Sequence, residues 1–523
     1  MVDRISSHVS ESLSEYLILP DWVVKPPEDI SLETVLGTNT NPEAITLQYP
    51  YMTARMQCVV GPDMAMEAGR QGILSFDPRS LPEEYKQEIL DKNNKARVKK
   101  GAIQFASDPA KAESNWPLEK VVKAVVEKTG HSVIPIVEDQ KLVGVYVHDP
   151  DNLPFVPPDT PIQKLMLPLR KGVGKENEVR VLVDNEDPRE IANVLGQEGN
   201  RGFIPIVDDN GILRKLAFKQ KYDTNFIGAV VNTRGDWKDE LKKWAPQVDT
   251  LCIDSSNACF QTAVDMVRYM KASKELRDKP FGVGNIVKGK DFTIFAKEGV
   301  DYVIAGMGVG SICQTGSKRG NGRGQFTVGL DIARARNRYH NNSGRYIPFA
   351  LDGGIETVHD ITVALALSDF AMMGNYFNRF FEAAGGKFKE VEGKKGPVFG
   401  EDITHVETWG EGSPRARLVS MYGINLRGGE SGKIGPESVL GRYGQSSLSG
   451  ATIEGVLGYV PYRGRLKPCV EDDARYIRAT ISNAGGVDLG SFRKNVKEKS
   501  LLEKASARTQ RDMLPHGLEV KKE

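Results

Sequence analysis

FGVGN (281–285) and YVIAGMG (302–308) are two of six short apolar runs that decide the fold of this chain. The other four are FIGAVVN (226–232), TLCIDSS (250–256), IPFALDGG (347–354) and FAMMGN (370–375). Each run ends in small or polar residues and precedes a segment of helical character, a pattern typical of buried parallel strands in βα units. Because such crossovers are right-handed and evenly spaced here, the sequence predicts a closed α/β architecture, the (β/α)8 barrel.

The first unit of this barrel is expected near the N-terminus. The run ITLQYPYMTARM (45–56) is followed by MAMEAGRQG (64–72), which has helical character. An open doubly wound sheet is the alternative fold. It would be favoured by a glycine fingerprint at the first βα turn, which the sequence lacks.

Residues 97–223 interrupt the barrel pattern with an internal repeat. HSVIPIVEDQKLVGVYVHDPD (131–151) matches GFIPIVDDNGILRKLAFKQKYD (202–223), and each follows an amphipathic segment. A duplicated unit of helix, strand, turn and strand resembles a pair of CBS modules, with the proline-rich link 151–163 between them. In proteins with such pairs the modules often bind adenine nucleotides. A purely structural or oligomerisation insert is the alternative.

The chain is therefore expected to have four parts. They are the N-terminal part of the barrel (1–96), the tandem insert (97–223), the remainder of the barrel (224–470) and a C-terminal helix with its tail (471–523). The stretch 384–470 is rich in Gly, Lys and Glu and has little apolar periodicity, which predicts a lid or mobile binding flap. The tail is expected to form one helix, EDDARYIRATISNA (471–484), and a flexible polar end.

Composition excludes several classes of protein. Lys and Arg number 70 against 69 Asp and Glu, so a net charge of +1 favours neither a nucleic acid nor a membrane surface as partner. No run of apolar residues is long enough to span a bilayer, and the N-terminus does not resemble a secretory signal. Five cysteines suit reduced thiols better than a disulfide framework, so we expect a cytoplasmic protein.

Five consecutive strands of the predicted barrel end in polar residues or glycines. These tips are Asp254, Asn285, the loop 308–315, Asp352 to Gly354, and Gly374 with Asn375. In a barrel the C-terminal strand ends meet at one face, where active sites are built. Ordinary turn chemistry accounts for one or two such tips but not for all five. Ser311 and the glycines at these tips can together form a phosphate-binding cradle.

Cys313 is the candidate nucleophile. It lies in GVGSICQTGSKRGNGRGQ (308–325), where glycines make the loop accessible and Lys318, Arg319 and Arg323 would favour a thiolate. A loop cysteine can also be an inert small residue. Cys252 lies within an apolar strand and is predicted to be core, and no Cys or His group has metal-ligand spacing.

Several segments together resemble the IMP dehydrogenase family and, within it, the divergent prokaryotic-type branch. They are GNIV (284–287), GVGSICQT (308–315), DGGI (352–355), MGN (373–375), WGEGS (409–413), the pair Arg442-Tyr443, EGV (454–456) and VPYRG (460–464). The resemblance spans nearly the whole chain. It implies an NAD-dependent oxidoreductase that converts IMP to XMP, the first committed step of guanine nucleotide synthesis.

The resemblance also implies a mechanism in two steps. Cys313 would attack C2 of IMP, NAD+ would take the hydride, and water would hydrolyse the covalent thioimidate. Thr315 would help activate the water. Arg442 and Tyr443 would enter on the flap after NADH leaves, with Arg442 as the base and Glu454 as an alternative proton route through Thr315.

Binding residues are carried over from the same resemblance. The implied IMP contacts are Met56 at the purine, Asp352 at the ribose, Ser311, Gly353, Gly354, Gly374 and Asn375 at the phosphate, and Glu411 and Gly412 at the base. The implied NAD+ contacts are Asp254, Ser255, Ser256, Asn285 and Arg234. K+ would bind the carbonyls of Gly308, Gly310 and Cys313. The resemblance further implies a homotetramer and an adenine or guanine nucleotide at the CBS pair.

Two differences from the family's sequence pattern and two alternative functions bear on this interpretation. The tail ARTQRDMLPHGLEV (507–520) lacks the EGG tract that completes the family's cation ring, and Thr408 stands where a tyrosine is common. GMP reductase shares the barrel and the cysteine loop but uses NADPH and normally lacks the Arg-Tyr flap. A catalytically silent nucleotide sensor that uses its CBS pair is the rival from a different functional class.

Overall fold

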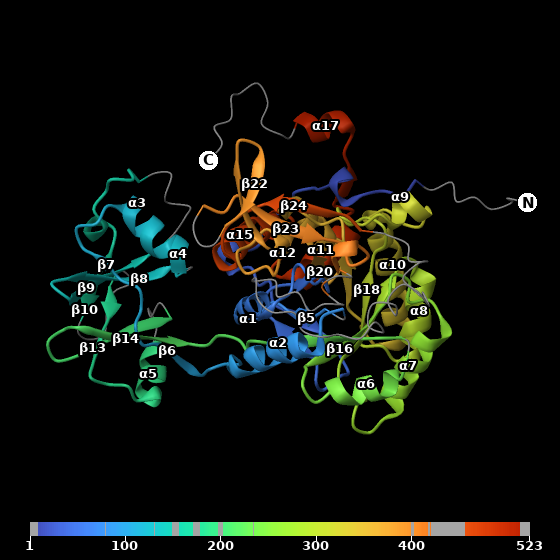
Figure 1. Ribbon diagram of the computed structural model, residues 1–523, viewed down its shortest axis with the longest axis horizontal. Coiled ribbons are helices and arrows are strands. Elements are labelled where there is room, and N and C mark those ends of the chain that lie inside the picture. The colour runs from blue at the N-terminus through green and yellow to red at the C-terminus, as the bar shows by residue number, and fades with distance from the viewer. Residues whose placement is uncertain are drawn as a thin grey trace, which may run out of the picture. The chain divides into compact units, whose positions relative to one another are not determined.

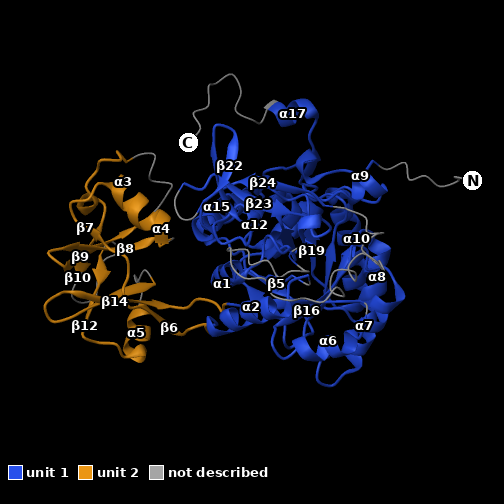
Figure 2. Cartoon of the chain, in the orientation of Figure 1, with its two compact units in different colours: residues 1–97, 225–523 blue, residues 98–224 orange. Residues whose placement is uncertain are grey.

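The computed structural model describes residues 9–78, 80–129, 131–148, 156–170, 178–196, 202–233, 235–398, 402–416, 419 and 455–512. The chain divides into two compact units (Figure 2). One comprises residues 1–97 and 225–523, and the other comprises residues 98–224. The smaller unit is therefore an insertion in the sequence of the larger one.

Eight parallel strands form the centre of the larger unit. They are β4 (Tyr51–Thr53), β5 (Ser75–Asp77), β15 (Ile227–Val231), β16 (Thr250–Asp254), β17 (Phe281–Ile286), β18 (Tyr302–Ala305), β19 (Phe349–Asp352) and β20 (Phe370–Met373), in the order β4-β20-β19-β18-β17-β16-β15-β5. A parallel bridge between Met52 and Leu74 brings the two edges of this sheet together. The predicted (β/α)8 barrel is confirmed, and the open sheet is excluded because its edges meet.

Helices surround these strands, as Figure 1 shows for α7, α8 and α10. The principal helices are α1 (Pro62–Arg70), α2 (Glu83–Lys95), α6 (Trp237–Trp244), α7 (Gln261–Ala272), α8 (Gly289–Glu298), α10 (Gln325–Ser343) and α11 (Val358–Leu367). The start of α11 shows how sequence sets a boundary. The Thr357 hydroxyl accepts the backbone N–H of Asp360, whose carboxylate accepts the N–H of Thr357 in return. This capping box satisfies two amides that the helix leaves unpaired.

The barrel is filled by its own side chains. Met52, Cys252 and Tyr302 belong to one buried apolar cluster that also contains Ile304 and Phe370. Every residue of β15 and of β16 is buried, because the helices cover one face and the barrel core covers the other. The prediction that Cys252 is core is confirmed.

Within the stretch 384–470, the described residues are more ordered than the sequence predicted. Its described residues form an antiparallel sheet in the order β22-β21-β23-β24, made of β21 (Lys387–Val391), β22 (Lys394–Pro397), β23 (His405–Trp409) and β24 (Leu457–Pro461). Most residues of β21 and β22 are only half buried or exposed, so these strands lack the apolar runs that mark the barrel. The predicted flap residues Arg442, Tyr443 and Glu454 lie outside the described residues.

The C-terminal tail also departs from expectation. After α15 (Leu466–Asn483) come α16 (Leu489–Glu498), β25 (Leu502–Lys504) and α17 (Ala507–Asp512), so up to residue 512 the predicted flexible end is instead folded; residues 513–523 lie outside the described residues. A capping box at Asp488 starts α16, and β25 pairs antiparallel with β1 (Tyr16–Ile18). The tail is therefore held by a strand from the opposite end of the chain, a partner that local sequence cannot reveal.

The smaller unit contains two matching halves. In one half β8 (Val133–Glu138) pairs with β9 (Lys141–Val147), and in the other β13 (Phe203–Val207) pairs with β14 (Leu213–Lys219). Both hairpins shift register at the same place, between Ile136 and Val137 and between Ile206 and Val207. This shared irregularity supports the internal duplication inferred from sequence.

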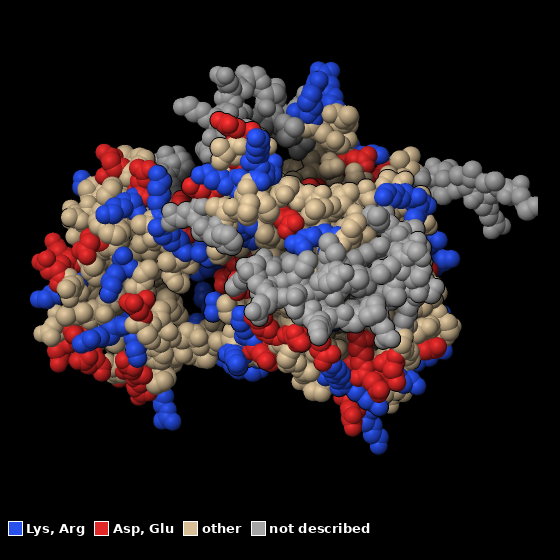
Figure 3. Space-filling view, in the orientation of Figure 1, with Lys and Arg blue, Asp and Glu red and all other residues tan. Residues whose placement is uncertain are grey.

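The described surface carries both signs of charge. Figure 3 shows Lys and Arg interspersed with Asp and Glu on the face in view, with no continuous basic tract. Among the described helices, none combines the length and apolar character that crossing a bilayer requires.

Candidate active site

A cavity of about 220 Å3 lies where the barrel strands end. Residues from the ends of β4, β16, β17, β18, β19 and β20 line it, together with the loop that follows β23. The predicted site residues that line it are Met56, Asp254, Ser256, Asn285, Gly308, Gly310, Ser311, Cys313, Thr315, Asp352, Gly353, Gly354, Gly374, Asn375, Glu411 and Gly412. These residues thus converge on one space, although they range from Met56 to Gly412 in the sequence.

Five predicted residues are not placed in this cavity. Ser255 is not among its lining residues, and the Ser255 hydroxyl donates instead to the carbonyl of Asn257 at 3.0 Å. Arg234, Arg442, Tyr443 and Glu454 lie outside the described residues.

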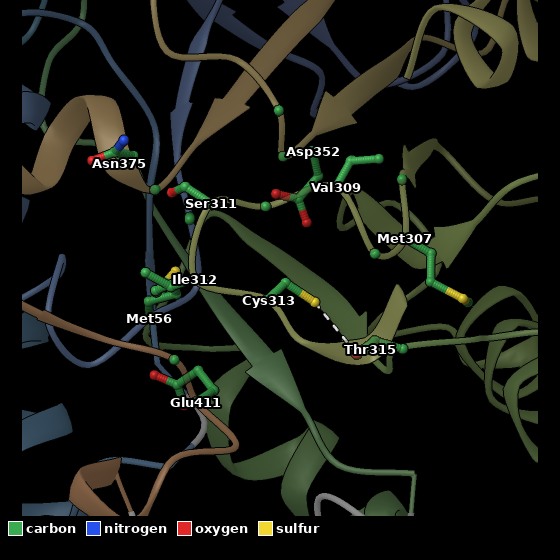
Figure 4. Close-up of a pocket in the computed structure, with 18 of the residues that line it drawn as sticks. Met56, Met307, Val309, Ser311, Ile312, Cys313, Thr315, Asp352, Asn375 and Glu411 are labelled. Atoms are coloured by element: carbon green, nitrogen blue, oxygen red, sulfur yellow. Dashed lines mark hydrogen bonds between the residues drawn. The ribbon is translucent and has the colours of Figure 1, made fainter. Parts of the chain in front are cut away.

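Cys313 presents a free, half-buried thiol to the cavity. Its loop connects β18 to the short helix α9 (Thr315–Arg319), and the Cys313 N–H donates to the carbonyl of Gly310 at 2.9 Å. The thiol lies 3.3 Å from the Thr315 hydroxyl, the contact drawn in Figure 4. A sulfur in this position can reach a ligand in the cavity, and the adjacent hydroxyl can donate to a thiolate.

The loop needs glycine at Gly308. This residue has a φ of +79°, and a Cβ there would lie 2.8 Å from the carbonyl oxygen of Asn321. A side chain would therefore push apart the two arms of the cysteine loop.

One predicted neighbour of the thiol has another partner. The Arg323 guanidinium lies 2.7 Å from Asp331 and donates to the carbonyl of Val287 at 2.6 Å. Lys318 and Arg319 lie on the exposed side of α9. The Arg323 charge is therefore paired with Asp331, and its expected role in favouring a thiolate stays a prediction.

Two carboxylates and an amide meet at the base of the cavity. Asp254 ends β16, Asp352 ends β19, and Asn285 lies in β17 between them. The Asn285 amide donates to Asp352 Oδ2 at 2.9 Å and to the carbonyl of Gly306 at 2.8 Å. These bonds fix the orientation of Asp352, whose carboxylate faces the same space as the Cys313 sulfur in Figure 4.

Arg55 also belongs to this cluster, although no sequence motif identified it as a site residue. Its Nη1 lies 3.3 Å from Asp254 Oδ1, its Nη2 lies 3.4 Å from Asp352 Oδ2, and Nη2 also donates to Asn285. The side chain is 5% exposed. An arginine directly after a predicted buried strand was the available signal, since buried charges are almost always paired.

Burial sets the electrostatics of Asp352. Removal from water raises the pKa of this carboxyl above its ordinary value, while the Arg55 charge and the Asn285 hydrogen bond act in the opposite direction. The carboxylate therefore depends on these neighbours to remain ionised near neutral pH.

Next to Asp352, the cavity is also lined by groups suited to an anion. Gly353 and Gly354 have φ values of +90° and +65°, which open the backbone there to close approach, and Ser311 adds a hydroxyl. Asn375 also lines the cavity, and its Oδ1 is buried without a hydrogen-bond partner among the described residues. Because the two ends of an amide can exchange by rotation, this side chain can offer either a donor or an acceptor to a ligand.

The loop after β23 is held against the loop after β4. The Glu411 carboxylate accepts the Gln57 backbone N–H at 2.6 Å and the Ser80 hydroxyl. The Trp409 indole donates to the Gln57 side chain at 3.2 Å. With the Glu411 side chain engaged in this way, the backbone of residues 410–412 lines the cavity next to Met56. The loop is thus held in place by Gln57, Ser80 and Trp409, a role that the sequence did not predict for any of them.

Comparisons with known proteins agree with this geometry. A sequence model described as the IMP dehydrogenase / GMP reductase domain matches residues 11–516. An inosine-5'-monophosphate dehydrogenase of Tritrichomonas foetus is 29% identical over 513 residues, covering 93% of this chain and 92% of that protein. Another, of Aquifex aeolicus, is 24% identical over 544 residues, covering 99% and 98%.

A solved structure extends the comparison to the fold. The GMP reductase of Trypanosoma brucei in complex with guanosine 5'-monophosphate aligns with a TM-score of 0.61 at 19% identity, covering 98% of this chain and 99% of that one. At this identity the match shows a shared fold.

Proposed function

Because the chain belongs to the IMP dehydrogenase / GMP reductase family, we propose that it is an IMP dehydrogenase of the divergent prokaryotic-type branch, which oxidises IMP to XMP with NAD+. The observation that carries this proposal is the free Cys313 thiol, which faces the same cavity as the strand-end groups of Asp352, Asn285 and Asp254. The similarity to the Tritrichomonas foetus enzyme over nearly the whole chain supports it. This reaction would commit IMP to guanine nucleotide synthesis.

The chemistry proceeds through a covalent intermediate on the cysteine. The Cys313 thiolate attacks C2 of IMP, a C–S bond forms, and the hydrogen on C2 leaves with its electron pair. NAD+ supplies the acceptor for that hydride. Water then adds to C2, the C–S bond breaks, and XMP leaves with the oxygen of water while the thiol is restored. Thr315, 3.3 Å from the sulfur, is placed to orient the water.

The cavity offers matching groups for the substrate. Asp352 can accept the ribose hydroxyls, and Ser311, Gly353, Gly354, Gly374 and Asn375 can donate to the phosphate. The backbone at Glu411 and Gly412 can meet the polar edge of the base, with Met56 against its face. The unpartnered atom of Asn375 is Oδ1, an acceptor, so Asn375 would donate to the phosphate with its amide rotated to present the NH2 group.

The dinucleotide would bind beside the substrate. Asp254 is a carboxylate at the margin of the same cavity, and Ser256 and Asn285 lie close to it, a donor and acceptor set that suits a ribose. Ser255 and Arg234 belong to this proposal on the resemblance alone. Asp254, Ser256 and Asn285 would hold the nicotinamide ribose.

K+ and the assembly are further parts of the proposal. The carbonyls of Gly308, Gly310 and Cys313 are oxygen ligands of the kind that hard cations prefer, and the Gly310 carbonyl already accepts one hydrogen bond. Among the described residues no group of three or more His, Cys, Asp or Glu side chains is arranged to hold a metal ion, so a cation there would rely on the backbone. We further propose a cytoplasmic homotetramer whose insert is a CBS pair that binds an adenine or guanine nucleotide.

Two parallel assays test the proposal against its nearest rival. Purified protein is incubated with IMP and NAD+, and separately with GMP and NADPH, while reduced nicotinamide is followed by absorbance. We expect NADH to form in the first assay and no NADPH to be consumed in the second. Consumption of NADPH without reduction of NAD+ would show a GMP reductase, which the shared barrel and cysteine loop also permit.

A mass measurement tests the sensor alternative. Protein mixed with IMP and NAD+ should gain the mass of the nucleotide on Cys313, and Cys313→Ser should not. The absence of an adduct on the wild-type protein, together with nucleotide binding by residues 98–224, would favour a sensor.

A further inference from the structure

Arg55 connects two carboxylates, and the proposed reaction leaves it without a role. We infer that Arg55 is a positioning residue that holds Asp352 and Asp254 as oriented, ionised acceptors for the ribose hydroxyls of the nucleotide and the dinucleotide. This inference rests on the proposed function, which assigns those ligands to the two carboxylates.

The Arg55 guanidinium connects strand ends that are not joined by backbone hydrogen bonds in the barrel. Arg55 follows β4, whereas its partners end β16 and β19, and neither of those strands is a ladder neighbour of β4. One terminal nitrogen reaches each carboxylate, at 3.3 and 3.4 Å. Nη1 also donates to the carbonyl of Ile253 at 3.3 Å, which fixes the guanidinium plane. A planar group with two terminal nitrogens can bridge in this way, and an ammonium cannot do so equally well.

Arg55 acts on ligands through its partners. Arg55 lines the cavity together with both carboxylates, but its side chain is 5% exposed and that of Asp254 is 6% exposed, whereas the Asp352 side chain is 21% exposed. The guanidinium is therefore turned toward the carboxylates, and Asp352 keeps a surface toward the cavity. Asn285 donates to the same Asp352 oxygen that Arg55 approaches, so that Oδ2 is held from two sides.

The two carboxylates need a shared cation. Burial raises the pKa of Asp352, the neighbouring Asp254 charge raises it further, and Arg55 opposes both effects. A protonated Asp352 would lose part of its capacity to accept hydrogen bonds from a ribose. Without Arg55 the carboxyl would be protonated at a higher pH, and nucleotide binding would fail there.

The experiment measures IMP affinity by calorimetry across a range of pH. Compared with wild type, Arg55→Met should weaken IMP binding about tenfold or more near neutral pH. It should also move the pH at which affinity is half lost upward by about one unit. Arg55→Lys should restore that midpoint, because it keeps the charge, but should leave affinity a few-fold weaker because it cannot bridge both partners.

Measurements in a second variant, Asp352→Asn, distinguish a positioning role of Arg55 from a general effect on the structure. In Asp352→Asn, adding Arg55→Met should change IMP affinity by less than about twofold, because the group through which Arg55 acts has lost its charge. Arg336→Met is the matched control: Arg336 is also 5% exposed and pairs with Asp369 outside the cavity. It should leave IMP affinity unchanged even where it lowers stability.

The outcomes are distinguishable. A loss of affinity in Arg55→Met that is equal at every pH and undiminished in the Asp352→Asn background would overturn the inference. If Arg55→Met does not fold, Arg55→Lys alone decides. The inference would be overturned if Arg55→Lys bound IMP as tightly as wild type and lost half of that affinity at the same pH. Failure of the proposed function would look different, because the wild-type protein itself would not form NADH from IMP and NAD+.

Discussion

The Cys313 thiol and the Thr315 hydroxyl lie 3.3 Å apart, on either side of the point where the cysteine loop becomes helix α9. Thr315 is buried and is the first residue of that helix, so its side chain is held while the loop before it carries the nucleophile. The pair thus places a hydroxyl next to the sulfur of the proposed covalent intermediate. We expect this hydroxyl to act in the hydrolysis of that intermediate.

Removing this hydroxyl should slow hydrolysis. Thr315→Val keeps the shape of the side chain, and we expect turnover to fall about 100-fold, as for the loss of a group that assists proton transfer. Thr315→Ser should keep most of the activity, because it retains the hydroxyl. Rapid quenching followed by mass measurement should find the adduct on Cys313 accumulating in Thr315→Val. Equal slowing of adduct formation and adduct decay would contradict this role.

The flap arginine should act after hydride transfer. Arg442, assigned from sequence, would serve as the base once NADH has left, so Arg442→Ala should slow hydrolysis far more than hydride transfer. A rapid burst of about one NADH per active site should precede a slow steady state in stopped-flow absorbance. Arg427→Ala, in the same stretch of chain, is the matched control and should behave as wild type. A burst that disappears in Arg442→Ala would count against the assignment.

A single methyl group at Gly306 should disturb the barrel next to the site. Gly306 has a φ of +146°, and a Cβ there would lie 2.1 Å from the carbonyl oxygen of Asp352. Gly306→Ala should therefore cost about 2–3 kcal/mol and weaken IMP binding, because the ends of β18 and β19 must separate. Gly396→Ala is the control, since a Cβ at Gly396 meets open space. Thermal unfolding and calorimetry would measure both effects, and an unchanged midpoint in Gly306→Ala would refute the prediction.

Asp369 should give the barrel an acid-sensitive contribution to stability. Burial acts to raise its pKa, but Arg493 and Arg336, with hydrogen bonds from Tyr346 and Phe349, outweigh burial and leave the pKa below its ordinary value. A lowered folded-state pKa means that the stabilisation is present above the unfolded pKa and is lost as pH falls through the folded one.

The substitution Asp369→Asn tests this direction of the pH dependence of stability. At neutral pH it should destabilise the protein by about 3–5 kcal/mol, because the buried guanidinium of Arg336 and the half-buried one of Arg493 lose their counterion. The difference in the free energy of unfolding between Asp369→Asn and wild type should become smaller as pH falls below about 4. Urea unfolding at neutral pH and below about pH 4 measures this difference. A difference that is constant with pH would show that packing, and not charge, accounts for the loss.

The barrel could be predicted because its strands are buried on both faces. Such strands read as continuous apolar runs, and six of them stand out between residues 226 and 375. The sheet of β21 to β24 could not be predicted in the same way, since the two strands β21 and β22 are largely half buried or exposed. The β1–β25 pair was also hidden, because its two strands lie at opposite ends of the chain.

The sequence by itself determined which groups stand at the strand ends, and hence that Cys313, Asp352 and Asn285 would meet at one face. It could do so because a closed barrel brings all C-terminal strand ends together, so chain order alone gives their neighbourhood. Only the tertiary structure decided how those groups are charged and held. The Arg55 bridge between Asp254 and Asp352 depends on side chains from strand ends that are far apart in the sequence. No local pattern records such a contact, because each partner alone looks like an ordinary polar residue at a strand end.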